Sequence, residues 1–89
     1  FSEYQCPFCA RVTPTLREIE QKYPGKVRIV FKDFPLPNHA EAPKAAEAAH
    51  CAGEQGKYWE LHDRLFANQR QLQVPELKAH AKAVGLDQA

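Results

Sequence analysis

The sequence of 89 residues lacks any long apolar run and any block of like charge. Its longest apolar stretch, at residues 27–31, is interrupted by Arg28, whereas a membrane-spanning helix needs about 20 predominantly apolar residues. The 12 Lys and Arg residues nearly balance the 11 Asp and Glu residues, which leaves a net charge of +1. These absences argue against a transmembrane segment and against a surface that attracts nucleic acid or anionic membranes.

Cysteine is scarce as well, with three residues: Cys6, Cys9 and Cys51. A small secreted scaffold that depends on disulfides for stability usually has more cysteines, at wider spacings. Two of these three lie close together, so we interpret them as working cysteines. Internal repeats and low-complexity segments are also missing, and a chain of this length forms at most one domain.

Apolar periodicity, together with proline and glycine, predicts the order strand, helix, strand and three helices. Residues 1–4 are predicted to end one strand, and the apolar alternation of residues 27–34 predicts another, covered on much of both faces. In the first helix, Pro14 removes one backbone hydrogen bond and predicts a kink. The predicted helices cover residues 7–23, 43–53, 56–69 and 74–86.

The last three helices carry faces suited to packing. On the helix predicted at residues 43–53, a smooth face that another helix can approach closely is formed by Ala42, Ala45, Ala46, Ala49 and Ala52. Residues 56–69 carry two adjoining apolar stripes, which predict a helix packed over a wide face. In residues 74–86, Gly85 followed by Leu86 predicts a Schellman-type cap. We expect three aromatic residues to build the helical core, unless some of them line a peptide groove: Tyr58, Trp59 and Phe66.

The opening stretch FSEYQCPFCARVTPTL carries the strongest chemical signal. Cys6 lies where a strand gives way to a helix, so unpaired backbone N–H groups and the helix dipole favour its thiolate. Cys9 lies one helical turn later on the same side and can close a disulfide. Pro7 suits the first helical position because its missing N–H is not needed there. Since the thiolate is the nucleophile of disulfide exchange, this motif predicts a dithiol–disulfide switch.

Two other interpretations of Cys6 and Cys9 stay open. A zinc site would need two more ligands, and only Cys51 and four scattered histidines are available, without a second CxxC or an HxxxH pair. The pair could also form an inert structural disulfide. We favour the redox pair, which requires neither a metal nor an organic cofactor.

Other reactive or polar residues have ordinary structural interpretations. Cys51, among alanines, is expected to be a small buried side chain, with a second redox thiol as the alternative. Glu3 is expected to be a solvated acid at a strand end, although it could lie near the cysteine pair and tune it. His50 and His62 are expected at the polar edges of their helices rather than as ligands. Phe8 is expected to be exposed and to touch substrate.

Three segments, FSEYQCPFC, KDFPLP and AAHCAGEQGKYWELHDRLF, together resemble the DsbA-like thiol–disulfide oxidoreductases of the thioredoxin-fold superfamily, in particular the bacterial group with a CPFC-type centre. The resemblance runs along nearly the whole chain. It implies an α/β fold, with residues 1–38 as the first part of a thioredoxin-like domain and residues 39–89 as part of its inserted helical domain. It also implies that Cys6 is the exposed attacking cysteine, Cys9 the buried resolving one and Pro14 the kink proline.

The chain departs from the family pattern in several places. Phe8 stands where DsbA has histidine, so a strongly oxidising character does not carry over. By the resemblance, the buried acid that assists proton transfer would precede Phe1, and the cis-proline loop facing the CxxC would follow Ala89. We therefore expect the chain to be a truncated piece of a longer protein.

The resemblance implies an enzyme that exchanges a Cys6–Cys9 disulfide with cysteines of exported proteins, in the periplasm or elsewhere outside a bacterial cytoplasm. The implied partners are cysteine-containing polypeptides, faced by Pro7 and Phe8, and a redox protein that resets the disulfide; nucleic acid and stable membrane insertion are not implied. A disulfide reductase or isomerase would use the same site. A glutathione-binding relative usually lacks the second cysteine, so Cys9 argues against one. A metal-binding CxxC module without enzymatic activity is the remaining alternative.

Overall fold

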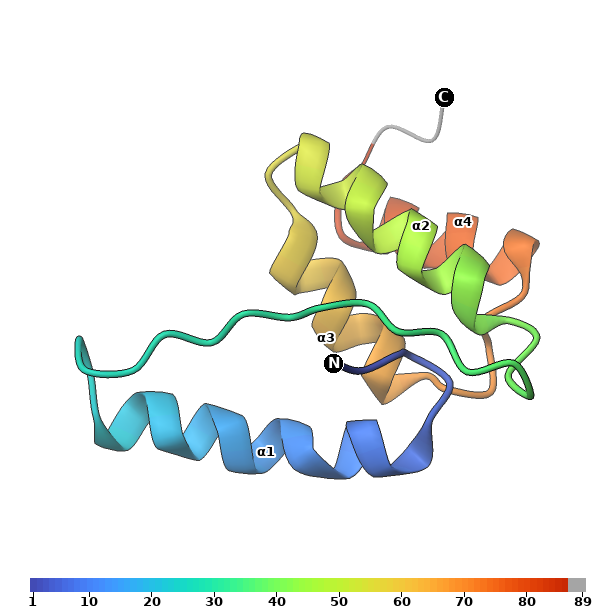
Figure 1. The fold of residues 1–89 in the computed structure, drawn as a ribbon. Helices are drawn as coiled ribbons and strands as arrows, with labels where there is room; N and C mark the ends of the chain where they lie inside the picture. Colours follow the sequence, from blue (N-terminus) through green and yellow to red (C-terminus); the bar gives the residue numbers. More distant parts are fainter. Residues whose placement is uncertain (87–89) are drawn as a thin grey trace.

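The fold is that of a computed structural model, which describes residues 1–86. Helices α2, α3 and α4 pack against one another, while α1 lies apart from them, alongside an extended segment that follows it (Figure 1). Within the described part of the chain, no helix is both long and apolar enough to cross a membrane. The helices are α1 (Pro7–Lys22), α2 (Ala42–Glu54), α3 (Tyr58–Ala67) and α4 (Val74–Ala83).

The two predicted strands do not form as strands. Over residues 1–86, the β-type pairing is a single parallel bridge between Ser2 and Asp33, with flanking backbone hydrogen bonds of 2.9 and 2.8 Å. Its parallel direction is the one that a strand–helix–strand unit requires. A pair of strands is marginal in water without further strands, so residues 27–31 run extended and make no backbone hydrogen bond within the described chain. The α/β class and the inserted helical domain are therefore not established by this fold.

The helix predictions are confirmed in position. Helix α1 begins at Pro7 and continues through Pro14. After α4, Gly85 adopts φ 85°, and the Leu86 N–H donates to the Ala81 carbonyl at 2.9 Å, which is the predicted Schellman cap. The division at residue 38 into two units stays a prediction, and residues 87–89 of the second unit lie outside the described residues.

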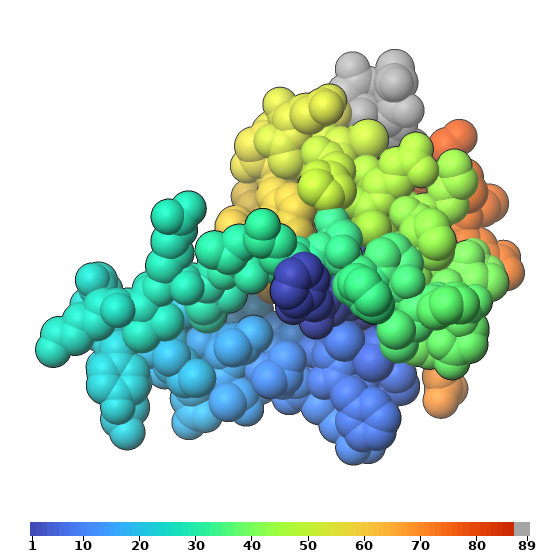
Figure 2. Space-filling model, viewed as in Figure 1, coloured from blue at the N-terminus to red at the C-terminus, as the bar shows by residue number. Residues whose placement is uncertain are grey.

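The buried core is formed mainly by residues of α2, α3 and α4, together with Tyr4. All five alanines of the predicted face of α2 are buried, and Ala45, Ala49 and Ala52 pack in one cluster with Leu61, Leu65 and the fully buried Tyr4. In contrast, α1 has no buried residue, and Val12 on its apolar face and Tyr23 directly after its end are exposed. The C-terminal end of α1 and the chain that follows it project from the rest of the molecule (Figure 2). Helices α2, α3 and α4 are thus well packed, whereas α1 is not.

His62 of α3 is buried, with 6% of its surface exposed, so its expected position at a polar helix edge is wrong. Burial lowers the pKa of His62 and raises that of Tyr4, whose hydroxyl oxygen lies 3.2 Å from His62 Nδ1. Trp59 is 46% exposed and does not belong to the buried core, contrary to expectation. The imidazole is surrounded by the rings of Tyr4, Phe31, Tyr58, Trp59 and Phe66, with centroids 4.7 to 6.0 Å away.

Protonation of His62 is expected to destabilise the fold. The folded protein binds this proton less readily than the unfolded chain, so its contribution to stability is complete above about pH 6.5, the ordinary histidine value, and is lost as the pH falls. Denaturant unfolding should show a free energy that declines on acidification, by at most about 1.4 kcal/mol per pH unit from this one proton. His62→Gln should remove that slope, whereas His50→Gln at an exposed histidine should retain it. An unchanged slope in the His62 variant would contradict the assignment.

Candidate functional site

The CxxC motif lies at the start of α1, as the sequence predicts. Cys6 is the N-cap residue, with extended backbone angles (φ −73°, ψ 121°), and its carbonyl accepts the hydrogen bond of the Ala10 N–H at 3.2 Å. Its side chain makes no capping hydrogen bond. The free N–H groups of the first turn and the positive end of the helix therefore favour a negative charge near this sulfur.

The exposures of the two cysteines are opposite to those that the resemblance implies. Cys6 is buried, with 8% of its surface exposed, and Cys9 is half-buried; both are free thiols. The segment before α1 carries the fully buried Tyr4, and Cys6, two residues later, is buried with it. Helix α1, which carries Cys9, has no buried residue. Phe8 is 73% exposed, which confirms its predicted exposure.

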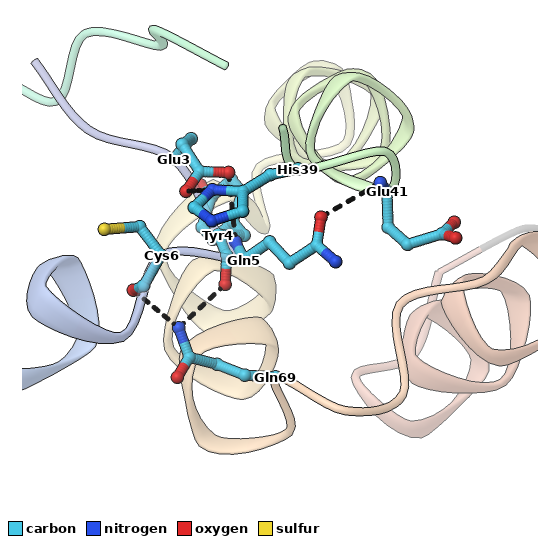
Figure 3. A network of polar contacts seen from close by, with 7 residues as sticks. All are labelled: Glu3, Tyr4, Gln5, Cys6, His39, Glu41 and Gln69. Carbon is cyan, nitrogen blue, oxygen red and sulfur yellow. Dashed lines mark hydrogen bonds and ion pairs between the residues drawn. The ribbon is translucent and has the colours of Figure 1, made fainter. Parts of the chain in front are cut away.

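Glu3 is not the solvated acid that its position at a strand end suggested. It is 1% exposed, and its carboxylate and the sulfurs of Cys6 and Cys9 all lie within 4.8 Å of one another. His39 Nδ1 lies 2.7 Å from Glu3 Oε1, and the Gln5 N–H donates to Oε2 at 3.3 Å (Figure 3). A buried and hydrogen-bonded carboxylate therefore faces the cysteine pair.

The segment that carries Glu3 and Cys6 is held from two sides. The Gln69 amide donates to the carbonyls of Tyr4 and Cys6 at 3.0 and 2.8 Å, and Gln5 Oε1 accepts the N–H of Glu41 at 3.0 Å (Figure 3). These bonds tie the segment to the chain after α3 and to the residue before α2. Sequence reasoning missed these contacts because the partners lie 36 to 65 residues apart and form no local pattern.

Cys9 opens on a groove of about 560 Å³ between α1, the extended segment and α3. Its lining is largely apolar, although Arg17 and Asp63, which form a 3.1 Å ion pair, also border it. The apolar lining residues include Phe8, Val12, Phe31, Trp59 and Phe66. A polypeptide side chain next to a reacting cysteine could be received here.

We expected no metal partly because no third ligand seemed to lie near Cys6 and Cys9. That reason is wrong. Glu3, Cys6 and Cys9 bring three potential ligand atoms together. A tetrahedral structural zinc site takes four protein ligands, and no fourth Cys, His, Asp or Glu of residues 1–86 joins the group. The expectation that no metal binds here stays a prediction.

Reduced full-length protein is expected to keep only substoichiometric zinc after dialysis against a mild chelator, because three groups do not close a tetrahedral site. Elemental analysis of the dialysed protein measures this. A Cys6→Ser, Cys9→Ser double variant supplies the background. Stoichiometric zinc that is lost in the double variant would instead support a metal-binding module.

Cys51 is exposed, so its expected burial is wrong. The buried face of α2 includes Ala49 and Ala52, and Cys51 lies about 200° around the helix from Ala49. Cys51→Ala is therefore expected to change the free energy of unfolding by no more than about 0.5 kcal/mol and to leave thiol exchange intact. Parallel denaturation and exchange assays test this, and lost exchange at unchanged stability would reveal a redox role for Cys51.

Comparison with known proteins adds a family and a set of longer relatives. A sequence model described as thioredoxin matches residues 1–89. The chain is 40% identical over 88 residues to Na(+)/H(+) antiporter NhaA 3 of Salinispora tropica, 38% to NhaA 1 of Salinispora arenicola and 30% over 87 residues to NhaA of Herminiimonas arsenicoxydans. Each alignment covers 98% of this chain but only 13% or 14% of the relative, so the chain spans about one-seventh of the length of these proteins. No solved structure matches.

Proposed function

Because the chain belongs to the thioredoxin family, we propose that Cys6 and Cys9 form a redox centre that exchanges disulfides with protein thiols, in the manner of DsbA-like oxidoreductases. The observation that carries the proposal is the CxxC at the N-terminus of α1 with both sulfurs within 4.8 Å of a buried carboxylate. Helix N-termini favour thiolate, which is the reactive form in exchange.

In the oxidative direction, a substrate thiolate attacks the Cys6 sulfur of the Cys6–Cys9 disulfide. A bond between substrate and Cys6 forms, and Cys9 leaves as a thiolate. A second substrate thiolate then attacks the substrate sulfur of this mixed disulfide, which forms the substrate disulfide and releases Cys6. Two electrons have passed to the cysteine pair, and a redox partner accepts them to restore the disulfide. The reduction potential sets the direction, so reduction or isomerisation would use the same residues.

The proposed substrates are cysteine-containing polypeptides of exported proteins. Phe8 supports this because it is exposed between the cysteines and lines the groove on which Cys9 opens. Pro7 would contribute the adjoining backbone surface. We place the reaction outside the cytoplasm, in the periplasm or an equivalent compartment, since disulfides persist there.

The proposal is tested by trapping the mixed disulfide in the full-length protein. Cys9→Ser should capture a disulfide-bearing polypeptide in a long-lived adduct at Cys6, because the resolving thiol is missing. Cys6→Ser should form no such adduct and should lose turnover with a reduced, unfolded substrate. Cys51→Ser is the matched control and should behave as the wild type. Turnover that survives in the Cys6 variant would refute the proposed centre.

The relatives support a second candidate function, redox control of cation transport, because this chain aligns with one part of proteins named Na(+)/H(+) antiporters. In this case the thiol state of Cys6 and Cys9 would modulate a transporter to which residues 1–89 are joined. Transport by the longer protein in vesicles should then differ between oxidising and reducing buffers, and a Cys6→Ser, Cys9→Ser variant should lose the difference. A transport rate that is the same in oxidising and reducing buffers would eliminate this candidate.

A further inference from the structure

We propose that Gln69 is the positioning residue of the redox centre: its side-chain amide holds the backbone at Cys6 and so keeps the Cys6 sulfur at the N-terminus of α1. The inference rests on the disulfide exchange proposed above. It assigns a role to a residue that follows Cys6 by 63 positions and lies outside the CxxC motif. Gln69 acts through the backbone of Cys6 and not on the sulfur itself.

The first observation is the pair of hydrogen bonds that the Gln69 amide makes. Its Nε2 donates to the Tyr4 carbonyl at 3.0 Å and to the Cys6 carbonyl at 2.8 Å (Figure 3). Both partners are carbonyl oxygens, which only accept, so the nitrogen of the amide and not its oxygen must face them. The two N–H groups of one side chain therefore hold two carbonyls directly before α1.

The second observation is that the start of α1 has little other support. Helix α1 has no buried residue, and the Cys6 side chain makes no capping hydrogen bond. The Cys6 carbonyl accepts the first hydrogen bond of the helix from the Ala10 N–H at 3.2 Å, a longer distance than that to Gln69. Most helical stability in proteins comes from packing, which α1 lacks. Its own helix therefore does little to fix Cys6.

The third observation is that Gln69 is itself held in place. It lies in the turn after α3, between the buried Phe66 and the buried Leu72. Within this turn the Gln71 N–H donates to the Asn68 carbonyl at 2.9 Å. The turn is thus anchored in the core on both sides, and the Gln69 amide extends this anchorage to the CxxC motif.

Position matters because the effect of a helix N-terminus on a charge is short in range. The unpaired N–H groups and the helix dipole stabilise a negative charge only near the first turn, so a displaced Cys6 sulfur loses part of this effect. A dithiol with a stabilised thiolate gives up its electrons less readily, and its disulfide is the stronger oxidant. Loss of the Gln69 amide should therefore make the Cys6–Cys9 disulfide harder to reduce and the Cys6 thiol slower to react.

The test is the equilibrium of the full-length protein with glutathione, in which two glutathione thiols reduce the Cys6–Cys9 disulfide and become one glutathione disulfide. Gln69→Leu removes both hydrogen bonds at a similar side-chain size, and Gln69→Ala removes them without adding a large apolar group. Each variant should lower the equilibrium constant for reduction about fivefold, the scale of a charge at a helix terminus.

The rate at which iodoacetamide alkylates Cys6 gives a second readout, as a function of pH. At mildly acidic pH, both Gln69 variants should react more slowly than the wild type by a similar factor, because less thiolate is present. At alkaline pH the rates should become equal, since the thiol is then ionised in every variant. Glu3, the titratable group beside the two sulfurs, and its partner His39 are retained throughout.

Gln71→Leu is the matched control, since it makes the same change at an exposed side chain of the same turn, and it should give the wild-type constant and pH profile. Wild-type values in both Gln69 variants would overturn this inference alone and leave disulfide exchange standing. Variants that do not fold, or that react more slowly by one factor at every pH, would mean a structural role and would also overturn it. If the wild type exchanges no disulfide, both the proposed function and this inference fail.

Discussion

Cys6 of the reduced full-length protein is expected to react with iodoacetamide at mildly acidic pH at least about tenfold faster than Cys9 or Cys51, because its N-cap position favours the thiolate. Only the thiolate attacks the reagent, and at acidic pH an ordinary thiol supplies very little of it. Mass spectrometry of the labelled peptides at short reaction times gives the three rates.

This experiment separates charge from exposure. Exposure alone ranks Cys51 first, then Cys9, and Cys6 last. Labelling in that order would show that accessibility dominates and would reverse the assigned roles of Cys6 and Cys9. Repeating the reaction in denaturant is the control, since unfolding should make the three rates nearly equal.

Residues 1–89 produced as a separate polypeptide are expected to associate and to show little disulfide exchange compared with the longer protein. Val12 on α1 and Tyr23 just after its end leave an apolar surface uncovered, and residues 27–31, which include the exposed Val30, present unpaired backbone groups. An open edge of this kind invites strand addition from a second molecule. By the resemblance, exchange should also be weak because the substrate-facing cis-proline loop is missing.

Sedimentation velocity over a range of concentrations, with amide exchange of residues 27–31, measures this association. Val30→Lys should reduce it, because a charge on an open edge opposes pairing, whereas Lys26→Ala, which adds no charge at the edge, should not. A well-protected monomer that melts cooperatively and exchanges disulfides at the rate of the longer protein would contradict the expectation.

The parts of the fold that were predictable depend on interactions within a few residues. Pro7 suits a first helical turn and Gly85 a left-handed cap, so the start of α1 and the end of α4 could be predicted from the sequence. The alanine face of α2 followed from helical periodicity in the same way. The exposure of Cys51 could have been predicted in the same way, because its angle around the helix from the buried alanines follows from the sequence spacing. Strand formation could not be predicted in this way, since a strand needs pairing partners from elsewhere in the chain.

The sequence by itself determined the approximate positions of the helices and that two cysteines lie at a helix N-terminus, because backbone sterics and capping act over one or two turns. The tertiary structure alone decided that Glu3 is buried against His39, 36 residues away, and that the Gln69 amide holds the carbonyl of Cys6. It also decided that His62 lies within an aromatic cluster. Burial and long-range hydrogen bonds depend on which surfaces pack together, and no spacing along the chain encodes that.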